Sequence, residues 1–308
     1  MSATRKIRGP YAVLSDAFSR LGRRSWAFLL LLLFPLTYLV LMYAVPVLLL
    51  IGRSLLSYDV ATQVTGGFTL ENYARFLRDP DYLRVLATTL RIGVAVTILD
   101  LVIGYPVAYL LARISGMRKQ VLMAIIVSPI LVSIVIRTFS WAIVLRGSGP
   151  LNQLLMGIGL IEHPLRLLYT ETAVIIALTH VYLPFMIIPL STVIESIDPT
   201  LELAASSLGA NAVRRFFEVI LPLSLPGITA GCMLVLTMAV SGYVTPAMLS
   251  GNRFLVMPTL VAQEMQVLIN WSFGSAIAVV LIVVVLTIVG LFSALTDSAA
   301  KYRRKVAS

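Results

Sequence analysis

Residues 198–222 read DPTLELAASSLGANAVRRFFEVILP and connect two long apolar stretches of the chain. Asp198 is a favourable helix N-cap, Pro199 suits the first helical position, and Gly209 is typical of a helix end. These signals predict a helix of about three turns over 199–210. Its small Ala and Ser side chains leave a slim face that fits the groove of another protein, although an ordinary amphipathic loop helix has the same appearance.

The two stretches that flank this helix carry no charged side chain over 172–194 and 219–252. Each is long enough to cross a bilayer, which needs roughly 20 residues as a helix. The whole chain has the same character, since 59% of its 308 residues are hydrophobic and 12% are charged, against about 25% charged in soluble domains. This composition excludes a disordered chain, a disulfide-stapled secreted module and an ordinary cytosolic enzyme.

We therefore predict an all-α membrane protein with six transmembrane helices. The expected spans are about 26–52, 88–112, 120–145, 172–194, 222–248 and 273–295. The same patterns divide the chain into a basic cytoplasmic or interfacial segment at 1–25, a six-helix domain at 26–296 that contains the loop 195–221, and a basic cytoplasmic tail at 297–308.

The distribution of Lys and Arg predicts the orientation of these spans. Fifteen of the 24 lie in segments that would share one side of the membrane with both termini, and seven lie in the opposite loops. Cytoplasmic loops carry the excess of Lys and Arg, so both termini are expected in the cytoplasm. Leu14, Phe18 and Leu21 recur at helical spacing before the first span, which predicts an interfacial helix or a basic flank that only fixes orientation.

Motifs of soluble catalysis are missing from the sequence. There is no G-x-x-x-x-G-K-[ST] phosphate-binding loop, no H-E-x-x-H zinc site and no G-x-S-x-G nucleophile elbow. Cys232 is the only cysteine, so neither a disulfide within the chain nor a thiolate zinc cluster can form. We expect no catalytic residue, metal or cofactor on this chain. The cytoplasmic loops, rather than nucleic-acid binding, explain the net charge of +10.

Two charged side chains fall inside predicted spans. Asp100 lies near the middle of the second span, and Arg137 lies in the outer part of the third. Charges in lipid are costly, so such residues usually face the interior of a helix bundle or a water-filled path. The alternative is a structural pair, or an Arg137 side chain that snorkels to the interface. With nearby aromatic residues they form the candidate translocation path, which comprises Asp100, Arg137, Trp141, Tyr182 and Tyr243.

The loop at 195–221 resembles the EAA motif of permease subunits of bacterial ABC importers. That motif reads E-A-A-x-x-x-G and continues to I-x-L-P, and the residues of this chain in its register are Ala204, Ala205, Gly209, Leu221 and Pro222. Leu203 occupies the position of the motif's Glu, and the acid stands one residue earlier at Glu202. A shift of one residue is about 100° around a helix, so Glu202 makes the usual contact only where the helix is locally rotated.

Other segments resemble the spermidine/putrescine branch of these permeases. Residues 104–109 read GYPVAY and are similar to its G-Y-P-x-A-[WY] stretch, and residues 136–141 read IRTFSW and are similar to its I-R-x-[YF]-x-W. The similarity extends over about residues 30 to 295. It implies the type I ABC importer permease (MetI-like) fold, in a multi-pass protein of the bacterial inner membrane.

The resemblance also implies partners and roles. A dimer of separate ATPase subunits, which would carry ATP and Mg, is expected at the cytoplasmic face. A second homologous permease and a periplasmic or extracellular solute-binding protein complete the assembly. The solute would be small and polar, a polyamine or a related amine, although Arg137 suits an anionic or zwitterionic amine better. The residues expected to couple to the ATPase are Glu202, Leu203, Ala204, Ala205, Leu208, Gly209, Arg214, Phe216, Leu221 and Pro222.

Two other functions are compatible with the same composition. A secondary transporter driven by an ion gradient would use broken helices and Asp100, but it does not account for the motif in the loop. A membrane scaffold without transport would account for the few polar groups within the spans. Mutation of Asp100 or Arg137 would leave the function of such a scaffold intact.

Overall fold

The computed structural model describes residues 25–59 and 64–307, and the interfacial helix expected before the first span lies outside them. The chain divides into a first unit that ends at Arg53 and a second that begins at Ser54. Helix α2 (Ser25–Ser54) belongs to the first unit up to Arg53; it covers the expected first span and includes an apolar stretch of 24 residues, Leu31–Ser54. That stretch is long and apolar enough to cross a membrane.

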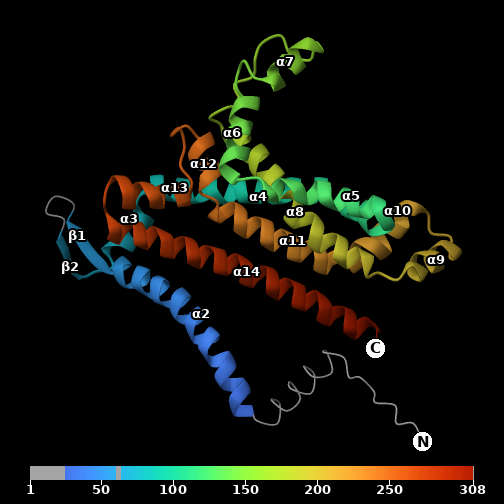
Figure 1. Ribbon diagram of the computed structural model, residues 1–308, viewed down its shortest axis with the longest axis horizontal. Coiled ribbons are helices and arrows are strands. Elements are labelled where there is room, and N and C mark those ends of the chain that lie inside the picture. The colour runs from blue at the N-terminus through green and yellow to red at the C-terminus, as the bar shows by residue number, and fades with distance from the viewer. Residues whose placement is uncertain (1–24, 60–63, 308) are drawn as a thin grey trace, which may run out of the picture. The chain divides into compact units, whose positions relative to one another are not determined.

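The second unit is helical apart from one antiparallel hairpin, in which β1 (Leu56–Asp59) pairs with β2 (Val64–Phe68) (Figure 1). Its remaining elements follow in this order: α3 (Glu71–Arg78), α4 (Pro80–Arg113), α5 (Gly116–Val127), η1 (Ser128–Leu131), α6 (Ile134–Val144), α7 (Pro150–Gly157), α8 (Glu171–Glu195), α9 (Pro199–Ser207), α10 (Ala212–Arg215), η2 (Phe216–Ile220), α11 (Leu221–Ser241), α12 (Val244–Leu249), α13 (Met257–Ala262), η3 (Gln263–Val267) and α14 (Trp271–Ala307).

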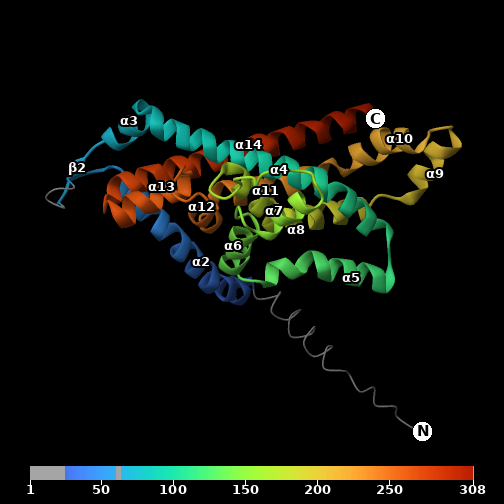
Figure 2. The same cartoon turned by 90° about the horizontal axis from the view of Figure 1, so that it is seen from above.

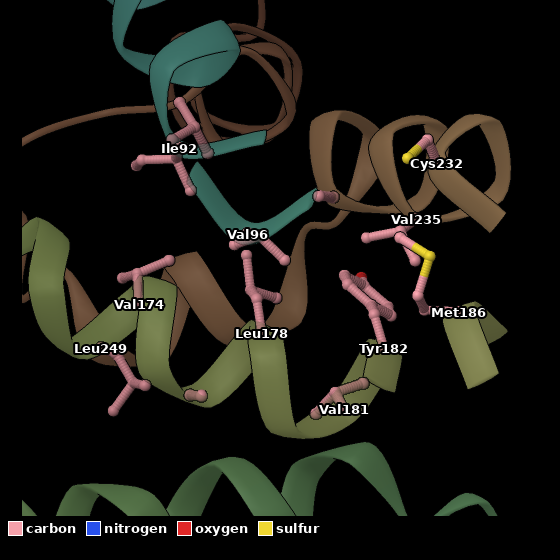
Figure 3. Close-up of a cluster of buried hydrophobic side chains, with 13 residues drawn as sticks. Ile92, Val96, Val174, Leu178, Val181, Tyr182, Met186, Cys232, Val235 and Leu249 are labelled. Atoms are coloured by element: carbon pink, nitrogen blue, oxygen red, sulfur yellow. The ribbon is translucent and has the colours of Figure 1, made fainter. Parts of the chain in front are cut away.

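Three long helices, α4, α8 and α11, pack against one another and form the core of this unit. Figure 3 shows their side chains interleaving, with Val96 of α4, Tyr182 of α8 and Val235 of α11 in one cluster. Gly227 and Gly231 of α11 make the close approach to α8 possible. A Cβ atom at Gly227 would lie 2.9 Å from a carbon of Val193, and one at Gly231 would lie 2.6 Å from the sulfur of Met186. Small residues spaced by four are a common means of packing helices in membranes.

The expected third span, 120–145, is not one straight helix. It is divided into α5 and α6, which are joined through η1 and bent by 94° (Figure 2). The break lies between Leu131 and Ile134, where Val132 takes an extended conformation three residues after Pro129. The structure therefore holds five helices long and apolar enough to cross a membrane among its described residues, or six if the bent pair counts as one span.

The expected fifth span, 222–248, is also interrupted. Helix α11 ends at Ser241, Gly242 takes an extended conformation, and α12 begins at Val244. A Cβ atom at Gly242 would lie 2.9 Å from the hydroxyl of Tyr182, so the break brings backbone close to that side chain. At the other end of the chain, α14 continues through Ala307 as one helix and includes residues expected to form a separate tail.

Candidate docking helix and translocation path

The predicted short helix in the loop exists as α9, and its first turn is fixed by local chemistry. The Asp198 carboxylate accepts a hydrogen bond from the backbone N–H of Thr200 at 2.8 Å, and Pro199 stands at the first helical position. This backbone hydrogen bond lowers the pKa of the Asp198 carboxyl below its ordinary value. The cap therefore remains charged and bound at neutral pH.

The C-terminal end of α9 is equally well defined. Gly209 has a φ of 86°, a left-handed conformation that favours glycine. The N–H of Ala210 donates to the carbonyl of Ala205, and the N–H of Gly209 donates to the carbonyl of Ser206, each at 3.0 Å. This pair of hydrogen bonds is the Schellman arrangement, which satisfies carbonyls that the helix leaves open. Helix α9 is thus a short helix that is capped at both ends (Figure 1).

Helix α9 and its C-cap residue expose large apolar side chains. Leu203 is 65% exposed and Leu208 is 89% exposed. The segment that follows exposes two more, Val213 and Phe217. Large exposed apolar side chains are unfavourable in water, and several in one segment are typical of a surface that another protein covers.

Glu202, one residue before Leu203, is directed towards the protein rather than towards solvent. Glu202 forms an ion pair with Arg113, the last residue of α4, and its side chain is only 16% exposed. The structure therefore places Leu203 outward and Glu202 inward, about 100° apart around the helix. In this conformation the carboxylate of Glu202 contacts the chain itself.

The remaining candidate coupling residues continue from α9 towards α11. Arg214 donates from Nε to both carboxylate oxygens of Glu218 at 2.9 Å, on an exposed face. Phe216 begins the π-helical turn η2, and its ring meets that of Tyr105 edge to face, with centroids 5.4 Å apart. Two others, Leu221 and Pro222, lie half-buried at the start of α11, and Ala204 and Ala205 lie within α9.

Asp100 is the most unusual residue of the candidate path. It is 0% exposed, and neither carboxylate oxygen has a hydrogen-bond partner. It lies on α4 within electrostatic range of Tyr182 on α8 and Cys232 on α11, so it is enclosed by the three core helices. A buried acid without a hydrogen-bond partner destabilises a folded protein.

Arg137 and Trp141 lie on α6, and Arg137, like Asp100, is within electrostatic range of Tyr182. With His180 of α8 they line a cavity of about 310 Å³. The indole N–H of Trp141 donates to Nδ1 of His180 at 3.3 Å, whereas Nε and Nη1 of Arg137 are buried without hydrogen-bond partners. Asp100 and Arg137 do not form the structural pair that was one interpretation of the sequence.

The two tyrosines of the candidate path, Tyr182 and Tyr243, have different surroundings. Tyr182 is buried in the core and donates its hydroxyl hydrogen to the carbonyl of Met238 at 3.1 Å. Tyr243 instead lines a polar cavity of about 490 Å³ beside α12 and α13, whose other polar lining residues are Ser250, Asn252, Thr259, Gln263 and Gln266. This cavity was not predicted from the sequence, although Gln263, Glu264 and Gln266 are polar residues in an otherwise apolar region.

The loop before α8 is held together by a single buried side chain. Asn152 of α7 is 0% exposed; it donates to the carbonyls of Arg146 and Leu165 and accepts from the N–H of Leu165 at 2.8 Å. These three hydrogen bonds join both ends of the loop and give it a defined shape.

Replacing Asn152 with alanine is expected to loosen this loop, because two carbonyls and one N–H lose their partner, at about 1–3 kcal/mol for each buried group left unsatisfied. Limited proteolysis of the purified protein should show faster cleavage within 146–171. Gln153→Ala is the matched control, since Gln153 is exposed and donates one side-chain hydrogen bond, to Ser148. Equal cleavage of the two variants would contradict the role of Asn152.

Comparison with known proteins shows that the chain is similar to permease components of bacterial transport systems. Residues 101–301 match the family model described as the binding-protein-dependent transport system inner membrane component. The chain is 37% identical over 247 residues to the spermidine/putrescine transport system permease protein PotB of Salmonella typhimurium, covering 80% of this chain and 86% of that protein. It is 28% identical to the inner membrane ABC transporter permease protein YdcU of Escherichia coli, covering 76% and 79% of the two chains.

Solved structures resemble the chain in fold. A bacterial ABC transporter that imports the acidic polysaccharide alginate aligns with a TM-score of 0.70 at 17% identity, covering 92% of this chain and 99% of that one. The MetNI methionine ABC transporter aligns with a TM-score of 0.55 at 19% identity, covering 70% and 95%. The arrangement of helices is therefore that of ABC importer permeases.

Proposed function

The chain belongs to the family of binding-protein-dependent transport system inner membrane components, and from this membership we propose what it carries and how it is driven. It is a membrane-spanning permease subunit of an ABC importer, and such subunits are not enzymes. In our proposal it pairs with a second permease and receives an organic amine of the polyamine type from a solute-binding protein. ATP hydrolysis on separate subunits drives the inward passage of this amine.

The observation that carries the substrate class is the 37% identity, over 80% of the chain, to a permease named for spermidine and putrescine. Asp100 gives this class a chemical basis, because a cationic amine favours an acid and aromatic faces along its route. The carboxylate of Asp100 is enclosed by α4, α8 and α11, so these helices separate before an ammonium group reaches it. The amine therefore binds to Asp100 in an open state of the permease, in which these helices are apart.

The docking role of α9 rests on three features. Its ends are fixed by the Asp198 cap and the Gly209 turn, Leu203 and the C-cap residue Leu208 are exposed, and its sequence is in register with the EAA motif. A rigid helix with an apolar face transmits force better than a mobile loop, since it moves as one body. In our proposal α9 inserts into a cleft of the ATPase subunit.

Alternating access then follows from the connection of α9 to the core. ATP closes the ATPase dimer and draws the two docking helices of the permease pair together, and the movement passes through η2 and Pro222 into α11. The path opens outward, receives the amine, and reopens inward after hydrolysis. A nearly complete switch requires ATP and the binding protein together to favour one state by about 5 kcal/mol.

The whole assembly provides the test. The chain is purified from its host in mild detergent, co-purifying proteins are identified by mass spectrometry, and the complex is reconstituted in liposomes with labelled spermidine outside. Recovery of a Walker-motif ATPase and a second permease, with ATP-dependent spermidine uptake, is the expected result. A folded chain that takes up spermidine without any ATPase would contradict the ATP-driven mechanism, and uptake of other solutes only would contradict the substrate class.

Leu208→Asp is expected to weaken ATPase binding without unfolding the permease. Leu208 is 89% exposed, so its removal costs the isolated subunit little, whereas burial of a leucine in an interface stabilises a complex by about 1.5–3 kcal/mol. Co-purification in mild detergent should therefore retain about a tenth of the ATPase or less. Leu154→Asp is the matched control, because Leu154 is also an exposed apolar residue, on α7 rather than α9. Equal ATPase recovery from both variants would argue against docking through α9.

A further inference from the structure

The ion pair between Arg113 and Glu202 joins two helices that are distant along the chain. Helix α9 continues from α8 and leads through α10 and η2 into α11, whereas α4 comes several elements earlier. Among the ion pairs of residues 25–59 and 64–307, this one alone connects α9 with α4. Movement of α9 is passed to α8 and α11 by the chain itself, but it can reach α4 only through side-chain contacts.

This pair is more sheltered than the other described ion pairs. The side chains of Arg113 and Glu202 are 30% and 16% exposed, whereas those of Lys119 and Glu195 are 27% and 54% exposed. The guanidinium of Arg113 also lies 5.1 Å from the ring centre of Tyr109 on the same helix, which restricts its orientation. Because the pair is sheltered from solvent, salt screens it less than an exposed pair. Because the Arg113 side chain is already restricted, forming the pair costs less side-chain entropy.

The helix ends favour the same pair. Arg113 is the last residue of α4, where the helix dipole favours a cation, and Glu202 lies in the first turn of α9, where it favours an anion. The neighbouring pair has the opposite arrangement, since Glu195 is the last residue of α8 and Lys119 lies in the first turn of α5. Lys119 and Glu195 therefore provide a natural control that has the same charges but lacks this support.

A second set of contacts connects the same half of α4 to the docking segment. The ring of Tyr105 packs edge to face against Phe216 of η2, and its hydroxyl is hydrogen-bonded to that of Ser224 of α11 at 2.9 Å. The inner half of α4 is thus joined to α9, η2 and α11 together.

We propose that Arg113 and Glu202 form a strut that makes the inner end of α4 follow the docking helix. This inference rests on the proposed docking of α9 to an ATPase. Because Leu203 stands where the motif has its Glu, the one acid of α9 is directed inward to α4, and the outward face is apolar. The pair therefore acts in coupling within the permease, and the ATPase is held by other residues.

The test measures ATPase recovery, ATP hydrolysis and spermidine uptake of the reconstituted importer in parallel. Arg113→Glu and Glu202→Arg should each leave ATPase recovery and ATP hydrolysis near normal but lower the uptake per ATP by about tenfold, within the usual range of coupling between sites. The double variant, which restores opposite charges, should regain most of the lost uptake, and Arg113→Lys should retain most of it. Lys119→Glu and Glu195→Lys should change the uptake per ATP little.

Three other outcomes would contradict the proposed role of the Arg113–Glu202 pair, and each can be distinguished from the others. Loss of the ATPase from the single variants would make the pair part of the docking surface. A double variant that inserts normally but transports as poorly as the single ones would show that the charges do not act as a pair. If the unaltered chain recovers no ATPase, the docking of α9 itself fails, and this is visible before any variant is made.

Discussion

Replacing Gly209 with valine is expected to abolish ATP-driven uptake while the protein still inserts into the membrane. Gly209 ends the docking helix with a φ of 86°, and a Cβ atom there would meet nothing within 4 Å, so the harm comes from backbone strain and not from a clash. A β-branched residue in this conformation costs about 1–3 kcal/mol. The turn relaxes to avoid that cost, the two Schellman hydrogen bonds break, and α9 no longer presents a fixed face to its partner.

The measurement combines membrane insertion, ATPase co-purification and spermidine uptake. Gly209→Asp should also abolish uptake and weaken ATPase binding, since it adds a charge beside the apolar face. Gly209→Asn should be the mildest change, because asparagine tolerates this backbone conformation best. Gly116→Val is the matched control, since Gly116 has a φ of 69° and equally open surroundings at the start of α5. Normal uptake by Gly209→Val would disprove the coupling role of this turn.

Replacing Asp100 with leucine is expected to make the permease more stable and inactive at the same time. The carboxylate oxygens of Asp100 are buried without partners, and each unsatisfied polar group of this kind costs about 1–3 kcal/mol. An apolar side chain of similar shape removes this cost, so the thermal midpoint of the purified protein should rise by a few degrees. If the carboxylate binds an ammonium group in the open state, spermidine uptake should fall by about tenfold or more.

Two further variants separate the charge from the packing. Asp100→Asn keeps the shape and loses the charge, so its uptake should fall as far as that of Asp100→Leu. Thr179→Val removes another buried hydroxyl without a partner, on α8, and should stabilise the protein without loss of uptake. Full uptake by Asp100→Asn would remove Asp100 from the translocation path. Loss of stability in Asp100→Leu would mean that the carboxylate has a partner in the folded protein.

Local sequence signals predicted several elements of the fold closely. Asp198 and Gly209 were expected to begin and end a short helix, and α9 runs between them from Pro199 to Ser207. The charge-free run at 172–194 corresponds to α8, Glu171–Glu195. These predictions succeed because capping and apolar length depend on neighbouring residues only.

Two spans were predicted less well. The third is bent between Leu131 and Ile134, and the fifth is broken at Gly242, although hydrophobicity alone is continuous through both. Apolar length shows that a segment can lie in a membrane, but it does not show whether the backbone stays helical there. Pro129 lies three residues before the first break and Gly242 lies at the second, and these residue types favour such interruptions.

The sequence by itself determined that this chain is an all-α membrane protein with a capped helix exposed between two apolar segments. The tertiary structure alone decided what the charged residues contact. Glu202 forms an ion pair with Arg113, whereas the carboxylate oxygens of Asp100 have no hydrogen-bond partner and do not pair with Arg137. Such contacts join residues far apart along the chain, and they depend on how α4, α8 and α11 pack. Periodicity records which face of a helix is apolar, but the partner of a polar side chain is fixed only when the helices meet.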